Sequence, residues 1–201
     1  MNCPLCSNPL PQKLYYEDRF RKFYQCSVCQ LVVADPGSWP DSGREKAEYD
    51  KHENDVNDEG YLTFLSRMFD PIHRTVPSNS KGLDFGCGPA PALANKLNSL
   101  GHEMTIYDPY YAPNELVFNV QYDFVTCTEV IEHLAQPLMQ FEQMLALLKP
   151  NGVLGIMTKL VLNRERFAHW HYKNDPTHIR FFSRKTFKYL AEKYQLSLRF
   201  I

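Results

Sequence analysis

A glycine-rich turn between two apolar segments is the part of the sequence best suited to chemistry. Gly86 and Gly88 follow a short apolar strand that ends at Leu83–Phe85. Glycine permits a turn tight enough for a ligand to lie against bare backbone, and a helix over 92–100 would offer its free N–H groups. Asp108 ends a second apolar strand, twenty residues after Gly88. A carboxylate there can accept both ribose hydroxyls, so the sequence predicts a nucleoside site.

One position of this turn departs from the usual pattern, because the third small residue is Ala90 rather than glycine. A strand–turn–helix corner that binds no ligand is therefore the competing interpretation. Tyr49 and His52 lie upstream, and they are either ordinary surface residues or a cover over the ligand. The residues that we expect at the nucleoside site are Asp84, Gly86, Cys87, Gly88, Tyr107, Asp108, Glu129, Tyr49 and His52.

Two Cys-x-x-Cys pairs stand near the start of the chain: Cys3 with Cys6, and Cys26 with Cys29, with nineteen residues between the pairs. This spacing is typical of a four-cysteine zinc ribbon, in which a hairpin brings four thiolates around one tetrahedral Zn²⁺. Four cysteines leave no open coordination position, so the sequence predicts a structural zinc ion. Disulfides are the alternative, which a reducing cytoplasm would disfavour.

Two acids and two histidines could activate a hydroxyl group. Glu129, Glu132 and His133 share one face if they form a helical turn, and His178 lies in a later loop that could fold over the same edge. Such a group can hold a divalent ion such as Mg²⁺ and polarise an acceptor. Without a metal, the catalytic candidates are His133, His178 and Glu129, with either histidine as a general base. The alternative is that Glu132 and His133 only cap the turn.

Alternating apolar and helical patterns predict the elements that must position these residues. Asp58 and Ser183 are expected to cap helices, and Pro137 to open one. Residues 109–121 leave no comfortable room for a full helix and a further strand. The predicted strands are 83–85, 104–107, 122–128, 153–158 and 196–201, and the predicted helices are 58–72, 92–100, 137–148 and 183–194.

Four segments together resemble class I S-adenosylmethionine-dependent methyltransferases. These segments are Asp84-Phe-Gly-Cys-Gly88, Asp108, the run from Asp123-Phe-Val to Glu129-Val-Ile-Glu-His133, and Leu147-Leu-Lys-Pro-Asn-Gly-Val-Leu154. The resemblance covers roughly residues 58–201 and implies S-adenosylmethionine as cofactor. It also implies an α/β fold with a Rossmann-like sheet. The full sheet of that class has one more antiparallel strand, so we expect an abbreviated sheet of five or six strands.

The resemblance extends to three kinds of acceptor. The Glu-x-x-Glu-His run with a later histidine looks like metal-dependent small-RNA 2′-O-methyltransferases and quinone-precursor O-methyltransferases. An N-terminal zinc segment also occurs in sugar C-methyltransferases and in a ribosomal-RNA guanine methyltransferase. We therefore expect methyl transfer to a small or medium-sized acceptor such as a nucleotide-linked sugar, with RNA bound through the ribbon as the rival. A non-catalytic cofactor-fold module that binds a partner is the third interpretation.

Composition and charge limit these choices. The chain has 201 residues, is 44% hydrophobic and has a net charge of −1, which does not indicate nucleic-acid binding by the whole molecule. Residues 41–59 hold eight acids and three bases, whereas 159–188 hold eight bases and two acids. One interpretation is that both are solvated surface segments without a function of their own. The other is that the basic segment faces an anionic acceptor, for example a diphosphate.

The expected organisation is a zinc ribbon over residues 1–36, a connector over 37–57 and a Rossmann-like methyltransferase domain over 58–201. No apolar run approaches the roughly 20 residues that a membrane span needs, and the chain does not begin with a signal peptide. We therefore expect a cytoplasmic protein without a membrane partner. The sequence leaves the oligomeric state open.

Overall fold

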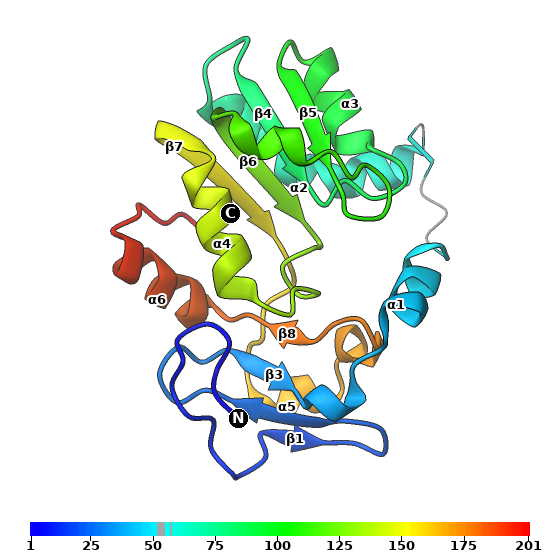
Figure 1. The fold of residues 1–201 in the computed structure, drawn as a ribbon, viewed down its shortest axis with the longest axis vertical. Helices are drawn as coiled ribbons and strands as arrows, with labels where there is room; N and C mark the ends of the chain where they lie inside the picture. The colour runs from blue at the N-terminus through cyan, green and yellow to red at the C-terminus, as the bar shows by residue number, and fades with distance from the viewer. Residues whose placement is uncertain (52–54, 57) are drawn as a thin grey trace. The chain divides into compact units, whose positions relative to one another are not determined.

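The structure is a computed structural model, and it describes residues 1–51, 55–56 and 58–201 (Figure 1). His52, which the sequence places near the nucleoside site, lies outside the described residues. Contacts divide the chain into two compact units, which are not consecutive in sequence. The first unit holds Met1–Glu45, Ile131–Met139 and Thr158–Ile201, and the second holds Lys46–Val130 and Gln140–Met157. The N-terminal and C-terminal segments thus share one unit, while the division at residues 36 and 57 stays a prediction.

The second unit contains a parallel four-stranded sheet in the order β5-β4-β6-β7 (Figure 1). Its strands are β4 (Lys81–Phe85), β5 (Glu103–Tyr107), β6 (Tyr122–Thr128) and β7 (Leu148–Met157). In β4, Phe85 pairs with Tyr107 and Asp84 pairs with Thr126, so the carboxyl ends of the first three strands meet at one edge. This arrangement confirms the Rossmann-like α/β fold.

Helices α2 (Glu59–Thr75) and α3 (Ala92–Ser99) pack beside this sheet. The Asp58 carboxylate accepts from the backbone N–H of Tyr61, which confirms the predicted helix cap. Helix α4 (Pro137–Ala146) begins at the predicted proline and runs across the division between the units. The buried residues of the core that α2 and α3 help to form are Leu65, Met68, Phe69, Ile72, Val76, Ala92, Leu93, Leu97 and Phe124.

The first unit contains an antiparallel sheet in the order β1-β2-β3-β8. Its strands are β1 (Tyr16–Glu17), β2 (Lys22–Gln25), β3 (Val32–Ala34) and β8 (Arg180–Phe181). The predicted ribbon hairpin is therefore present, but its sheet is completed by a strand from near the other end of the chain. The helices that follow in this unit are η1 (Pro36–Ser38), α5 (Arg164–Ala168), η3 (His171–Asn174) and α6 (Arg184–Tyr194).

Two expectations about elements are wrong. The parallel sheet of the described residues has four strands rather than five or six, because residues 109–121 form only the short η2 (Glu115–Asn119). Residues 196–201 lie in no strand: Gln195 adopts a left-handed conformation that ends α6, and Leu196, Leu198 and Ile201 beyond it are exposed. The predicted connector contains α1 (Ser42–Tyr49). Among the residues described here, no helix is long and apolar enough to cross a membrane.

Gly82 sits at the tightest point of the parallel sheet. A Cβ atom there would lie 2.2 Å from Cζ of Phe124 and 2.6 Å from Sδ of Met104. We predict that Gly82→Ala lowers the free energy of unfolding by about 1–3 kcal/mol, because the core must shift to admit the methyl group. Urea denaturation would measure this. The control Gly43→Ala, on exposed α1, should be neutral or stabilising; equal effects at both positions would contradict close packing at Gly82.

Candidate functional site

The glycine turn lies between β4 and α3, at the carboxyl edge of the parallel sheet. The N–H groups of Gly86 and Cys87 both donate to the Tyr107 carbonyl, at 2.8 and 3.1 Å, which fixes the turn to the end of β5. Gly86 and Gly88 have φ of 83° and 63°. A Cβ at Gly86 would meet Val130 at 2.4 Å, whereas at Gly88 it would meet no atom of the described part of the chain within 4 Å. Gly86 is therefore needed for packing, and Gly88 is where a ligand can approach the backbone.

Asp108 joins this turn to the loop that follows β5. Its Oδ2 accepts from the Gly88 N–H at 3.0 Å, and its Oδ1 accepts from the N–H groups of Tyr110 and Tyr111 at 2.8 and 3.1 Å. Its backbone also exchanges two hydrogen bonds with Ala112. A carboxylate has about four acceptor positions, so these three bonds leave about one for a ligand hydroxyl. Asp108 is thus a structural link as well as the predicted ribose acceptor.

Asp84 lies inside the sheet rather than at its surface. It is 3% exposed, and Oδ1 accepts from the Thr126 hydroxyl at 2.9 Å. Burial raises the pKa of Asp84 to about 6, the Thr126 hydrogen bond opposes this, and the nearby Asp108 charge adds to it. Burial likewise raises the pKa of the Cys87 thiol to about 12, so this thiol is an unreactive part of the turn.

The end of α1 reaches the loop after Asp108. The Tyr49 ring lies 5.9 Å from the Tyr110 ring, between centroids, and the Tyr111 hydroxyl donates to Asp50 Oδ1 at 2.6 Å. The structure therefore brings Tyr49 to the predicted cofactor loop. Sequence analysis missed Tyr110 and Tyr111, although two consecutive aromatic residues directly after an acid at a strand end were the available signal.

Glu129 does not share a helical turn with Glu132 and His133, contrary to expectation. Its φ is 51°, and its N–H donates to the Met157 carbonyl at 2.8 Å. This left-handed residue turns the chain out of β6, and Ile131–His133 then form a separate turn. Glu129 also belongs to the unit of the parallel sheet, whereas Glu132 and His133 belong to the other.

Glu132, His133 and His178 do lie together in the first unit, with potential ligand atoms all within 4.8 Å of one another. Glu132 is fully buried and accepts from the Tyr172 hydroxyl. Nδ1 of His133 lies 3.2 Å from the Thr177 carbonyl, and Nδ1 of His178 lies 2.7 Å from the Tyr172 carbonyl. A carbonyl only accepts, so each Nδ1 carries a proton, and in the neutral form of either ring the lone pair is then on Nε2.

The surroundings favour the neutral form of His178. Burial lowers its pKa, the Asp175 carboxylate opposes this, and the Arg21 guanidinium lowers it further. A neutral imidazole with a lone pair on Nε2 can accept a proton or bind a cation. The cluster can therefore act as a base or as a metal site.

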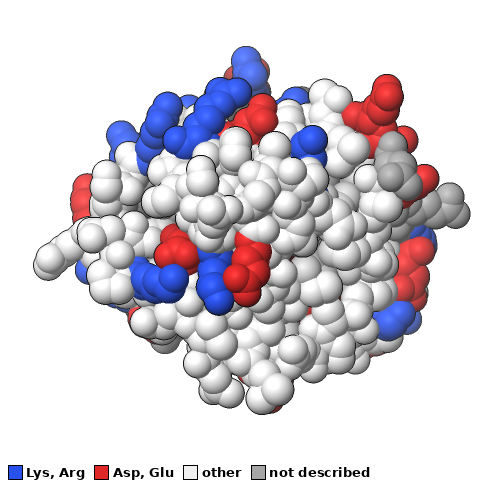
Figure 2. Space-filling view, turned by 90° about the horizontal axis from the view of Figure 1, so that it is seen from above, with Lys and Arg blue, Asp and Glu red and all other residues white. Residues whose placement is uncertain are grey.

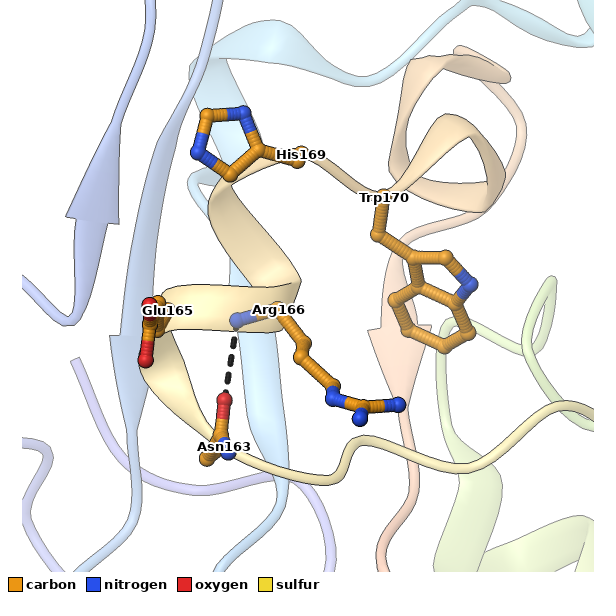
Figure 3. A pocket seen from close by; sticks show the side chains of 5 residues that line it. All are labelled: Asn163, Glu165, Arg166, His169 and Trp170. Carbon is orange, nitrogen blue, oxygen red and sulfur yellow. Dashed lines mark hydrogen bonds between the residues drawn. The ribbon is translucent and has the colours of Figure 1, made fainter.

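A hollow of about 530 Å³ lies in the same unit (Figure 3). Asn163 caps α5 by accepting from the Arg166 N–H at 2.8 Å, and the Arg166 side chain extends on the side where the Trp170 ring lies. Trp170 stacks on Tyr172 at 4.9 Å, and Tyr172 lies 4.0 Å from His178, between ring centroids. The residues that line the hollow are Asn163, Glu165, Arg166, His169 and Trp170.

The four cysteines form a group that fits a tetrahedral ion. Sγ of Cys3 lies 3.5 Å from Cys29, Sγ of Cys6 lies 3.4 Å from Cys26, and all four lie within 4.8 Å of one another. Zn–S bonds of about 2.3 Å would need edges of about 3.8 Å. These separations exceed a disulfide bond of about 2.05 Å. A hydrogen bond from Cys29 lowers the pKa of Cys3 to about 5, whereas burial raises the pKa of Cys6 to about 11 and the hydrogen bond to Cys3 raises that of Cys29, so without a metal ion the group favours one thiolate.

A family model described as a methyltransferase domain matches residues 60–199. The chain belongs to this methyltransferase family. No curated protein matches the chain. Among solved structures, a 1,6-didemethyltoxoflavin-N1-methyltransferase of Burkholderia thailandensis, with bound 1,6-didemethyltoxoflavin and S-adenosylhomocysteine, is 14% identical, with a TM-score of 0.53 over 90% of this chain and 87% of that one. A coclaurine N-methyltransferase bound to N-methylheliamine and SAH is 16% identical, with a TM-score of 0.43 over 70% and 49%.

The raised pKa of Asp84 gives the methyltransferase a pH-dependent stability. Between pH 3.8 and about 6 the folded state holds a proton that the unfolded state has lost, so the free energy of unfolding falls as pH rises. We predict that Asp84→Asn removes this slope, which is on the order of 3 kcal/mol in total. Urea denaturation of the ligand-free protein across this range would measure it. Asp70→Asn, on α2, is the control; an unchanged slope in Asp84→Asn would contradict the assignment.

Proposed function

We propose that this methyltransferase binds S-adenosylmethionine at the glycine turn and transfers its methyl group to a small or medium-sized, anionic acceptor such as a nucleotide-linked sugar. The observation that carries the proposal is the open space at Gly88 beside the Asp108 carboxylate. Bare backbone next to a buried acid suits a ribose. The fold is shared with the Burkholderia enzyme, which binds S-adenosylhomocysteine. Asp84, Gly86, Cys87 and Tyr107 would hold this turn, while Glu129 and Tyr49 are further proposed contacts.

Methyl transfer is an in-line displacement at a carbon that the sulfonium already activates, so the protein mainly aligns the two partners. The acceptor atom forms a bond to the methyl carbon while the bond from that carbon to sulfur breaks. If the acceptor is a hydroxyl, its proton must leave, and we propose Nε2 of His178 or His133 as the base. The hydrogen bonds from each Nδ1 to a backbone carbonyl hold the ring in the tautomer that can do this.

The basic segment 159–188 supports an anionic acceptor, but fewer of its bases are exposed than its composition implied. Two of its bases are internal: Lys173 and Arg180 are 6% and 2% exposed. The exposed bases of the segment include Arg166, which lines the hollow together with Trp170 (Figure 3). A hollow lined by a guanidinium and an indole ring suits an anionic group attached to a planar one. We propose this hollow as the acceptor's binding region.

RNA is the alternative acceptor, and a basic surface would favour it. On the face drawn in Figure 2, Lys and Arg side chains of the described residues gather in places, with acidic side chains among them and a broad uncharged area between. The acidic side chains among these bases do not favour RNA on the face drawn. A non-catalytic module is the other alternative. The space at Gly88 favours a ligand-binding protein instead.

We also propose that Cys3, Cys6, Cys26 and Cys29 bind a structural Zn²⁺, which needs the reduced thiols that the cytoplasm maintains. A divalent ion such as Mg²⁺ at Glu132, His133 and His178 is a separate alternative to the base. If it is correct, added Mg²⁺ would raise methyl transfer and shift the imidazole signals of both histidines. The oligomeric state stays open.

Calorimetric titration with S-adenosylhomocysteine tests the cofactor site. We predict micromolar binding by the wild type, and binding at least tenfold weaker in Asp108→Ala, which loses the ribose acceptor and the bond to the Gly88 N–H. Asp108→Asn, which keeps one acceptor oxygen, should lie between the two. The control Asp70→Ala should bind as the wild type does. No binding by folded wild-type protein would sink the proposed function.

Metal analysis tests the zinc site. We predict one zinc ion per chain in the wild type, and its loss in Cys26→Ser together with unfolding of the ribbon, because the ligand set then has only three thiolates. Cys87→Ser is the matched control and should keep its zinc, since Cys87 lies in the other compact unit. A zinc-free Cys26→Ser protein as stable as the wild type would refute the structural role.

A further inference from the structure

One arginine of the ribbon hairpin holds the loop that carries His178. Arg21 is 8% exposed, and its Nη1 donates to the carbonyl of His178 at 3.0 Å and to that of Pro176 at 3.4 Å, while Nη2 donates to the carbonyl of Lys173. Burying a guanidinium is costly unless its N–H groups are satisfied, and here three carbonyls of a single loop satisfy them. We define residues 171–178 as the His178 loop.

An ion pair makes a second contact between the ribbon and this loop. Lys173 Nζ lies 3.1 Å from Asp18 Oδ2, and the two side chains are 7% and 21% exposed. The other oxygen of Asp18 accepts from the N–H groups of Phe20 and Arg21, at 2.9 and 2.8 Å. Asp18 therefore shapes the turn that presents Arg21 and also receives a cation from the loop. The hairpin tip therefore contacts the loop through one cation, Arg21, and one anion, Asp18.

The ribbon also holds the chain on the other side of His178. The Ala34 N–H of β3 donates to the Ile179 carbonyl at 3.1 Å, and Val33 pairs with Arg180. The N–H groups of Ile179 and Arg180 both lie 2.9 Å from the Glu132 carbonyl. The pairing of β3 with β8 thus fixes His178 and the backbone of Glu132 together.

The cysteine group is continuous with this support. Strand β3 begins three residues after Cys29, and the Cys26 N–H donates to the carbonyl of the fully buried Leu31 at 2.9 Å. The apolar side chains of β2, β3 and β8 share a buried core, so zinc would act on the start of β3 by fixing the cysteine turn that leads into it. The Arg180 guanidinium also feels the charge of Cys3, which raises its pKa against the lowering by burial.

We propose that the zinc ribbon is an intramolecular brace for the acceptor-activating cluster, with Arg21 as its main positioning residue, so that zinc occupancy sets the orientation of His178. The inference rests on the proposed function, because it concerns the imidazole to which we give the role of base. It changes the role of the ribbon, from an appendage that binds a partner to a part that the methyltransferase site needs. The chemical partner of the ribbon is then the chain's own loop.

The test uses the full-length, ¹⁵N-labelled protein with one equivalent of zinc, in Arg21→Gln and in the matched control Arg19→Gln. Arg19 is an exposed residue of the same turn that lies over the Phe20 ring at 4.3 Å. Long-range ¹H–¹⁵N spectra show which imidazole nitrogen carries the proton. We expect the Nδ1–H tautomer of His178 in the wild type and in Arg19→Gln, and a mixture of tautomers in Arg21→Gln. Retention of the wild-type tautomer in Arg21→Gln would overturn the role of Arg21.

Hydrogen exchange tests the zinc link. We expect amides of residues 177–182 to exchange at least tenfold faster in Arg21→Gln and in wild-type protein stripped of zinc, while amides of β4 keep their protection. Unchanged exchange on zinc removal would overturn the brace. If Arg21→Gln fails to fold, Lys173→Met removes the ion pair with Asp18 but keeps the bond from Arg21 to the backbone carbonyl at position 173, so it should give a smaller spectral change of the same kind with zinc retained; no change there would also count against the proposal.

These readouts separate the inference from the proposed function. The tautomer and the exchange rates need neither cofactor nor acceptor, so a protein that fails to bind S-adenosylhomocysteine can still confirm the brace. Conversely, a protein that binds S-adenosylhomocysteine with wild-type affinity in every variant, and keeps the His178 tautomer, would keep the cofactor site and lose the brace.

Discussion

The pairing of β3 with β8 is the constraint on which the first compact unit depends. It joins Val32 and Val33, just after the second cysteine pair, to Arg180 and Phe181 near the other end of the chain. Neither segment has enough apolar surface to fold separately, and they share one buried core instead. Once these strands pair, Arg21 reaches the His178 loop and Glu132 receives the backbone of β8. The residues of this core are Phe23, Val32, Ala34, Val161, Phe167, Tyr172, Ile179 and Phe181.

In the second unit, the Asp108 carboxylate is the comparable constraint on the structure. Asp108 closes its own loop, holds the Gly88 N–H and retains about one acceptor position. An Asp108→Ala substitution alone therefore cannot separate the structural role of this carboxylate from its proposed role in ligand binding. The asparagine variant separates them in part, because it keeps one acceptor oxygen and loses the charge.

The sequence predicted features that are local in the chain and failed on those set by distant contacts. The helix cap at Asp58, the glycine turn, the cysteine pairs and the parallel strands all follow from spacing or from neighbouring residues. By contrast, no local pattern shows that residues 180–181 complete the sheet of the ribbon, or that the Arg21 side chain turns inward. The prediction that Glu129 shares a helical turn with Glu132 was wrong for a related reason. Its spacing from Glu132 fits a helix, but the chain leaving β6 adopts a left-handed conformation there.

Whether the charged side chains of the ribbon face solvent or the protein interior bears on the choice between RNA and a small acceptor. A surface that binds nucleic acid keeps Lys and Arg exposed, so that they can neutralise phosphates. Residues 1–36 carry only four bases, and the structure buries Arg21 against carbonyls and sets Lys22 3.6 Å from Glu17. Arg19 remains outward, but beside Phe20 on a turn that Asp18 also shapes. Because Arg21 is spent on an internal contact and Lys22 has an acidic partner, few free bases are left on the ribbon to neutralise phosphates, which fits the proposed brace better than a nucleic-acid clamp.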